Sequence, residues 1–122
     1  MNLFRRKKPA KIVESHVDVD PANLEASTVE GYLKRGLVYL ARGIQDKAEA
    51  DLRKVLTMNA DSVDAHYNLG LIYKKQGKTG EAQSSFKTAL EKIRVLEVDE
   101  PVRALMVSKL IKWQLTQVSE AG

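Results

Sequence analysis

The feature that most constrains the fold is an internal repeat of 34 residues. When residues 29–62 are placed over residues 63–96, seven positions are identical. These positions hold small, aromatic and aliphatic residues at helical spacing, a combination that indicates a true structural repeat. The identical pairs are Val29 and Val63, Gly36 and Gly70, Leu37 and Leu71, Tyr39 and Tyr73, Gly43 and Gly77, Ala48 and Ala82, and Leu56 and Leu90.

Each repeat carries the signals of two helices joined by a tight turn. Ser27-Thr28-Val29-Glu30 has the hydroxyl-x-x-acid form of a capping box, which satisfies free N–H groups at a helix start. Gly36 lies inside the first predicted helix, where glycine costs about 1 kcal/mol relative to alanine, so we expect a second helix to approach it closely. Gly70 and Ala82 are expected to allow the same approach in the second repeat. Gly43 suits the left-handed conformation that ends many helices.

The pattern resembles the tetratricopeptide repeat (TPR) family, in which an aromatic residue, Leu-Gly, Tyr, Ala, Phe and a closing Pro recur. The second repeat keeps most of it, with Leu69-Gly70, Tyr73, Ala82 and Phe86, and has His66 at the aromatic position. The first repeat keeps Tyr32, Gly36, Tyr39 and Ala48, but has Arg35 for Leu and Leu52 for Phe. The closing Pro is missing from both repeats, which have Ala60 and Arg94 at that position. The resemblance implies an all-α, right-handed stack of two helical hairpins, residues 29–62 and 63–96, inside a domain of residues 27–122.

Two hairpins leave an apolar end uncovered, so we predict a capping helix over residues 100–118. Pro101 suits its first turn, because proline lacks the N–H that would have no partner there. One face of this helix carries Val102, Leu105, Met106, Lys109, Leu110, Trp113 and Gln117. We expect the large apolar residues of that face to be buried against the second hairpin; these are Leu105, Met106, Leu110 and Trp113. Residues 1–26 are expected to form a flexible segment, first basic and then acidic.

Composition excludes several classes of protein. The chain has no cysteine, which excludes disulfides and thiolate metal sites. Its net charge of +4 is spread over mixed signs without the dense basic stripe of a nucleic-acid binder. No apolar run is long enough to span a membrane or to form a secretory signal, so we expect a cytoplasmic protein. The N-terminal Leu3-Phe4 and the four basic residues after it predict a disordered tail, with weak contact to an anionic membrane surface as the alternative.

The chain offers no pattern typical of catalysis. Gly77-Lys78-Thr79 has the ending of a phosphate-binding loop, but Ile72 stands where that motif needs a glycine. The two histidines, His16 and His66, are too few for a zinc site without cysteine, and no nucleophile lies at a meaningful spacing from a base. We therefore expect no enzyme activity, no cofactor and no metal.

The TPR resemblance implies that the first helix of each hairpin lines an inner groove that binds a protein or peptide. The corresponding groove residues are Leu33, Lys34, Leu37, Leu40, Tyr67, Asn68, Leu71, Lys74 and Lys75. Family members that bind a C-terminal carboxylate use Lys and Asn where this chain has Leu33 and Leu37, which disfavours such a ligand. Two alternatives stay open: the chain covers the groove with its own N-terminal segment, or it assembles into homo-oligomers through the groove or the helix ends.

Overall fold

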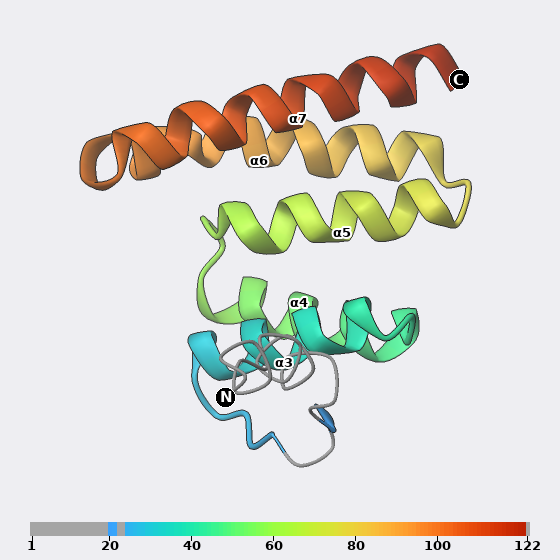
Figure 1. Ribbon diagram of the computed structural model, residues 1–122, viewed down its shortest axis with the longest axis vertical. Helices are drawn as coiled ribbons and strands as arrows, with labels where there is room; N and C mark the ends of the chain where they lie inside the picture. The colour runs from blue at the N-terminus through green and yellow to red at the C-terminus, as the bar shows by residue number, and fades with distance from the viewer. Residues whose placement is uncertain (1–19, 22–23, 122) are drawn as a thin grey trace, which may run out of the picture.

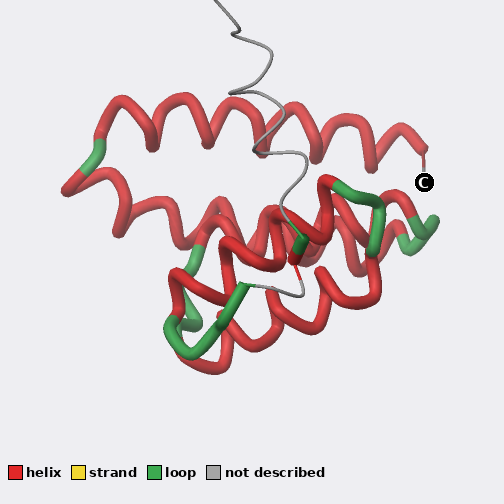
Figure 2. Tube along the Cα trace, turned by 60° about the horizontal axis from the view of Figure 1, so that its bottom comes forward, coloured by secondary structure: helices red, strands yellow, loops and turns green. Residues whose placement is uncertain are grey.

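The computed structural model describes residues 20–21 and 24–121 of the 122-residue chain. These residues form five helices, α3 (Val29–Ala41), α4 (Gln45–Met58), α5 (Val63–Lys75), α6 (Thr79–Asp99) and α7 (Pro101–Ala121). No strand occurs in this described part of the chain, as Figure 2 shows. The prediction of an all-α stack of helical hairpins is confirmed. The flexible segment and the membrane-contacting tail predicted at the N-terminus fall mainly on residues 1–19, outside the described residues.

The helices stack in chain order along one axis. Figure 1 shows the α3–α4 hairpin at the bottom, α5 above it, and α6 and α7 at the top. Helix α4 joins the two hairpins by packing against α5, and α7 packs along the length of α6. Helix α6 continues to Asp99 rather than ending near Leu96, and α7 covers 101–121 rather than 100–118. Because α6 and α7 are longer than α5, the pair that they form extends beyond the N-terminal end of α5 (Figure 1).

Local signals decide where the helices begin and end. The Oγ1 atom of Thr28 accepts a hydrogen bond from the Gly31 N–H at 3.0 Å, so Thr28, and not Ser27, caps α3. Ser62 caps α5 in the same way through the Ala65 N–H at 3.2 Å. In each hairpin one glycine in the left-handed region follows the first helix: Gly43 at φ 79° in the first hairpin and Gly77 at φ 76° in the second.

Glycine is required where the two helices of a hairpin meet. A Cβ atom added at Gly70 would lie 2.5 Å from Cε1 of Phe86, and one added at Gly36 would lie 3.2 Å from Cβ of Asp51. The close approach predicted at these two glycines is confirmed. In the second hairpin the space is filled by the ring of Phe86 rather than by Ala82, so glycine and phenylalanine form one packing unit.

One hydrophobic core runs through both hairpins and into α7. Its largest fully buried side chains are Phe86, Leu52 and Ile72 from the hairpins and Ile111 from α7. Helices α4, α5, α6 and α7 each contribute buried apolar residues at helical spacing, and α3 adds half-buried ones such as Tyr32 and Leu33. The buried set is Ala48, Leu52, Val55, Val63, Ala65, Leu69, Ile72, Tyr73, Ala82, Phe86, Ala89, Ile93, Ala104, Ile111 and Val118.

The predicted packing face of α7 is wrong. The four residues expected to be buried are exposed, with fractions of 58% for Leu105, 67% for Met106, 45% for Leu110 and 54% for Trp113. The face that packs against α6 is a second apolar stripe. It contains Ala104, Val107, Ile111, Leu115 and Val118. Because α7 is apolar on two sides, helical periodicity alone did not distinguish the packed side from the open one.

Candidate functional site

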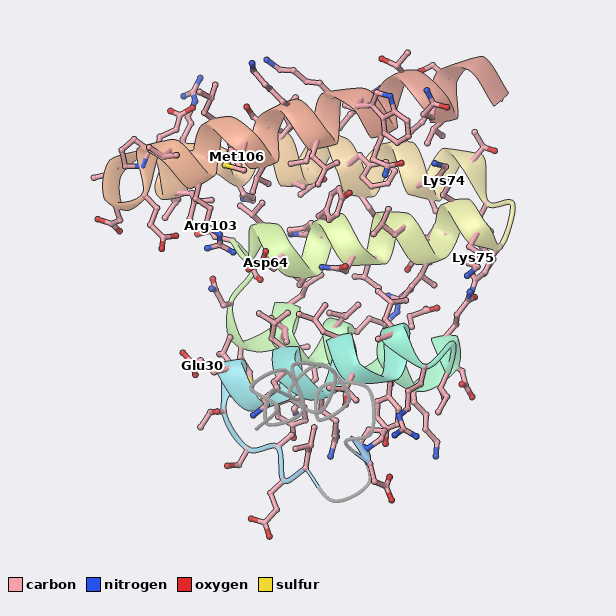
Figure 3. All side chains as sticks on the ribbon, in the orientation of Figure 1. Glu30, Asp64, Lys74, Lys75, Arg103 and Met106 are labelled. Carbon is pink, nitrogen blue, oxygen red and sulfur yellow. The ribbon has the colours of Figure 1, made fainter. Side chains whose placement is uncertain are left out.

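Helices α3, α5 and α7 contribute side chains to one face of the stack. The Nη2 atom of Arg103 on α7 lies 2.8 Å and 3.1 Å from the two carboxylate oxygens of Asp64 on α5. Further along, the Lys74 ammonium donates to Oε1 of Gln114 at 2.9 Å, and the Gln114 amide donates to the Tyr67 hydroxyl at 3.4 Å. Figure 3 shows Asp64 and Arg103 facing each other across the two helices. These polar contacts hold α7 beside α5, so α7 extends the inner face beyond the two hairpins.

A cleft of about 250 Å³ lies at one end of this inner face. It opens between the first turns of α3 and α5, the last turns of α6 and the start of α7. Its apolar wall includes Val29, Leu33, Val95 and Leu96. The carboxylates of Glu30, Asp61 and Asp64 also line it, so the cleft is acidic as well as apolar.

Two of these three carboxylates already have basic partners. Asp64 pairs with Arg103 at 2.8 Å, and Asp61 pairs with Lys92 at 3.0 Å. Hydrogen bonds with Glu100 and then with Asp64 raise the pKa of Arg103 above its ordinary value, so this guanidinium stays charged. Glu30 forms no ion pair within the described part of the chain and is exposed. Glu30 is therefore the carboxylate that is open to a ligand.

The other end of the inner face is basic. Lys74 and Lys75 form the last turn of α5, and both are exposed. Figure 3 places Glu30, Asp64 and Arg103 at one end of this face and the two lysines at the other. The Lys74 ammonium lies 5.5 Å from the centre of the Trp113 ring, a cation–π geometry that places this tryptophan at the edge of the face.

The predicted groove residues differ in how far the structure buries their side chains. Four apolar ones, Leu33, Leu40, Tyr67 and Leu71, are half-buried and pack against the core. Leu37 is open, with 37% of its surface exposed. Lys34, Lys74 and Lys75 are exposed around them, and Asn68 donates to the Asp64 carbonyl oxygen at 2.8 Å. The apolar floor is thus largely part of the core, and partner binding by these residues stays a prediction.

Sequence reasoning assigned three exposed residues of α7, Met106, Leu110 and Trp113, to the core. Their exposure and the contact of Trp113 with Lys74 now make them candidates for the rim of the inner face. Gln114 is the residue that shows which side of α7 faces the inner surface. Gln114 is 7% exposed and bonded to both Lys74 and Tyr67, so the side of α7 that carries it faces α5.

Other sites considered from the sequence have structural explanations. Gly77 follows α5 in the left-handed conformation, and Lys78 is the N-cap of α6, so the Gly77-Lys78-Thr79 segment is the turn between these two helices. The His66 ring donates from Nε2 to the Ala60 carbonyl oxygen at 2.9 Å. Among the described residues, no group of three or more potential ligands is arranged to hold a metal ion. None of the described helices combines the length and the apolar character needed to cross a bilayer.

Helical hairpins that stack around one continuous core and share an inner face define a helical repeat protein. Comparison with known families identifies the repeats. A family described as TPR repeat matches residues 36–77, and a family described as tetratricopeptide repeat matches residues 63–93. Residues 36–93 therefore consist of tetratricopeptide repeats, as the sequence pattern predicts. Such repeats form extended surfaces for binding, which implies a protein partner.

Several known proteins share this repeat region. The chain is 39% identical over 75 residues to DnaJ homolog subfamily C member 3 of Mus musculus, covering 62% of this chain and 14% of that protein. It is 28% identical over 99 residues to the tetratricopeptide repeat and J domain-containing co-chaperone of Cryptococcus neoformans, covering 81% of this chain and 19% of that protein. It is 33% identical over 61 residues to the type IV pilus assembly protein PilF of Pseudomonas aeruginosa, covering 50% and 24%. The chain thus spans less than a quarter of the length of each relative.

Proposed function

We propose that the protein binds a peptide segment of a partner protein on the inner face formed by α3, α5 and α7. The observation that carries the proposal is the layout of this face. Exposed apolar side chains, Leu37 on α3 and Leu110 on α7, lie between an acidic cleft and a pair of lysines. An apolar surface bordered by charge is typical of a protein-interaction site.

The charges at the two ends define the chemistry of the ligand. The cleft suits a lysine or arginine side chain, whose stem would contact Leu33 and whose charge would approach Glu30. Lys74 and Lys75 suit an acidic group at the other end. Asp64 and Lys75 are eleven residues apart on α5, about 16 Å of helix, which an extended peptide of about five residues spans. The preferred ligand is a short segment with a basic end, an apolar middle and an acidic end.

The names of the relatives support a protein as the ligand, since they refer to a co-chaperone and to the assembly of a pilus. A ligand held only by its terminal carboxylate is disfavoured, because Leu33 and Leu37 stand where the lysine and asparagine of such sites would be. The alternative occupant is the chain's own residues 1–19, which contain both basic and acidic groups. The cytoplasmic location stays a prediction.

Site-specific crosslinking tests the proposal. A photoreactive phenylalanine analogue replaces Leu37 in one variant and Ala50, an exposed residue of α4, in the control. We expect crosslinks to one partner protein from position 37 and none from position 50, and we expect Lys75→Glu to reduce them. Crosslinks between position 37 and residues 1–19 of the same chain would show that the protein covers its own groove. Equal crosslinking from both positions would contradict the proposal.

A further inference from the structure

The inner face has a counterpart in the chain's own sequence. The ligand proposed for this face has a basic end, an apolar middle and an acidic end. Lys11-Ile12-Val13-Glu14 has the same three parts in the same order. It is the one place within residues 1–28 where two apolar residues have a basic residue before them and an acidic residue after them. We call these four residues the internal ligand, because they match the chemistry of the chain's own binding face.

The charged groups that match the internal ligand are open on the inner face. Glu30 and Lys75 are both exposed, and neither forms an ion pair with another described residue. Figure 3 shows them at opposite ends of the face. The exposed Leu37 supplies an apolar contact on α3. The face therefore offers an acidic, an apolar and a basic contact in the order that the internal ligand requires.

The connecting chain is long enough for this contact. Leu24 lies beside α3, because its carbonyl oxygen accepts a hydrogen bond from Nη1 of Arg35 at 3.4 Å. The stretch from Glu14 to Leu24 spans up to about 33 Å when it is extended. The path from Leu24 to Lys75 needs less, with about 10 Å to pass around α3 and about 16 Å along the inner face.

From these observations we infer that the internal ligand occupies the inner face of its own molecule and competes there with the partner. Its ammonium lies in the acidic cleft beside Glu30, its apolar pair contacts Leu37, and its carboxylate approaches Lys75. The inference rests on the proposed function, because the same groups would hold the partner's peptide. It adds regulation to that function, since the partner binds only by displacing the internal ligand.

The tether favours the chain's own segment over the same segment of a second copy. A linker of about ten residues gives an effective concentration on the order of 1 mM, so even weak contacts hold the internal ligand in place. A second copy offers the segment only at the concentration of the protein itself. At micromolar protein the contact is therefore intramolecular, and the fraction of open molecules rises with the concentration of the partner.

Disulfide trapping tests the contact in the full-length chain, which has no cysteine of its own. The test pair is Ile12→Cys with Leu37→Cys. The control pair is Ile12→Cys with Ala50→Cys, at an exposed residue of α4. At about 1 μM protein in a glutathione buffer, we expect about tenfold more intramolecular disulfide from the test pair. Equal trapping by both pairs would overturn the inference, as would a test-pair disulfide that links two molecules.

Charge reversal tests the order of the contacts. Adding Lys11→Glu to the test pair should lower trapping about threefold or more, because the new carboxylate faces Glu30. Adding Glu30→Lys as well should restore it, since the two charges are again opposite. The matched control is Lys7→Glu, which lies outside the internal ligand and should change trapping little. A double reversal that traps no better than Lys11→Glu alone would contradict the inference. Circular dichroism checks that each variant keeps its helices.

Partner crosslinking separates this inference from the proposed function. The variant Lys11→Glu with Glu14→Lys no longer matches the face, so crosslinks from a photoreactive residue at position 37 to the partner should increase about threefold or more. Partner crosslinks of unchanged yield would overturn the competition but leave the proposed function intact. Disulfide trapping by the test pair without partner crosslinks in either protein would support the internal ligand and contradict the proposed function.

Discussion

Arg35 on α3 and the buried Asp51 on α4 form a two-pronged ion pair that closes the first hairpin. Nε donates to Oδ2 and Nη2 to Oδ1, both at 2.8 Å, and the Asp51 side chain is 8% exposed. Nη1 also donates to the Leu24 carbonyl oxygen at 3.4 Å, which holds the segment before α3. The hydrogen bonds to Asp51 are the main reason that the pKa of Arg35 lies above its ordinary value. The pair explains why arginine replaces the leucine of the repeat pattern.

We expect Arg35→Met to destabilise the protein by about 2–3 kcal/mol, because it leaves the Asp51 carboxylate buried without its partner. Arg35 is partly exposed, so the effect falls below that of a fully buried pair. The double variant Arg35→Met with Asp51→Leu should recover most of the loss. Urea unfolding measures all three proteins. A double variant as unstable as the sum of the two single changes would show that the pair is not the source of the effect.

Gly70→Ala should destabilise the second hairpin by about 1–3 kcal/mol, since the added methyl group would overlap the fully buried ring of Phe86. The control is Gly80→Ala on α6, where an added Cβ meets nothing within 4 Å. That change should be neutral or stabilising by up to about 1 kcal/mol, because alanine favours helix. Thermal unfolding distinguishes the two. Equal melting temperatures for both variants would contradict the close contact of Gly70 and Phe86.

The orientation of α7 can be tested with two neighbouring residues. Ile111 is fully buried, whereas Leu110 is 45% exposed. Ile111→Ala should cost about 2–4 kcal/mol through lost burial and a cavity, and Leu110→Ala should cost less than about 1 kcal/mol. Denaturant unfolding at low protein concentration measures both. A larger loss of stability from Leu110→Ala than from Ile111→Ala would show that α7 packs through the face that the sequence predicts for residues 102–113.

Lys74 and Lys75 are adjacent and exposed, but only Lys74 contacts α7. We expect Lys74→Met to cost about 1 kcal/mol, because the buried Gln114 loses a hydrogen bond to a charged donor. It should also alter the fluorescence of Trp113, the single tryptophan, by removing the cation above its ring. Lys75→Met, the matched control, should change neither property. Acrylamide should quench Trp113 strongly in the dilute protein, since 54% of this residue is exposed.

The fold of each hairpin can be predicted from the sequence because its determinants are local or lie within one repeat. Gly43 and Gly77 end their helices through their own backbone conformation. Gly36 and Gly70 reveal close contacts because glycine inside a helix is unfavourable without one. The 34-residue period then requires two such hairpins to stack in the same way. The charged ends of the inner face also follow from the positions of Glu30 and Lys75 in the first and last turns of their helices.

The side of α7 that packs against the stack was decided only by the tertiary structure. Helical periodicity supports two stripes on α7, one with Leu105 and Trp113 and one with Ile111 and Val118. The local sequence does not show which of the two stripes packs against α6, because both are apolar and both are regularly spaced. The choice depends on what α6 and α5 present to α7. The Gln114 amide finds Lys74 and Tyr67 only when Ile111 faces the core, so tertiary contacts forty or more residues away in sequence decide it.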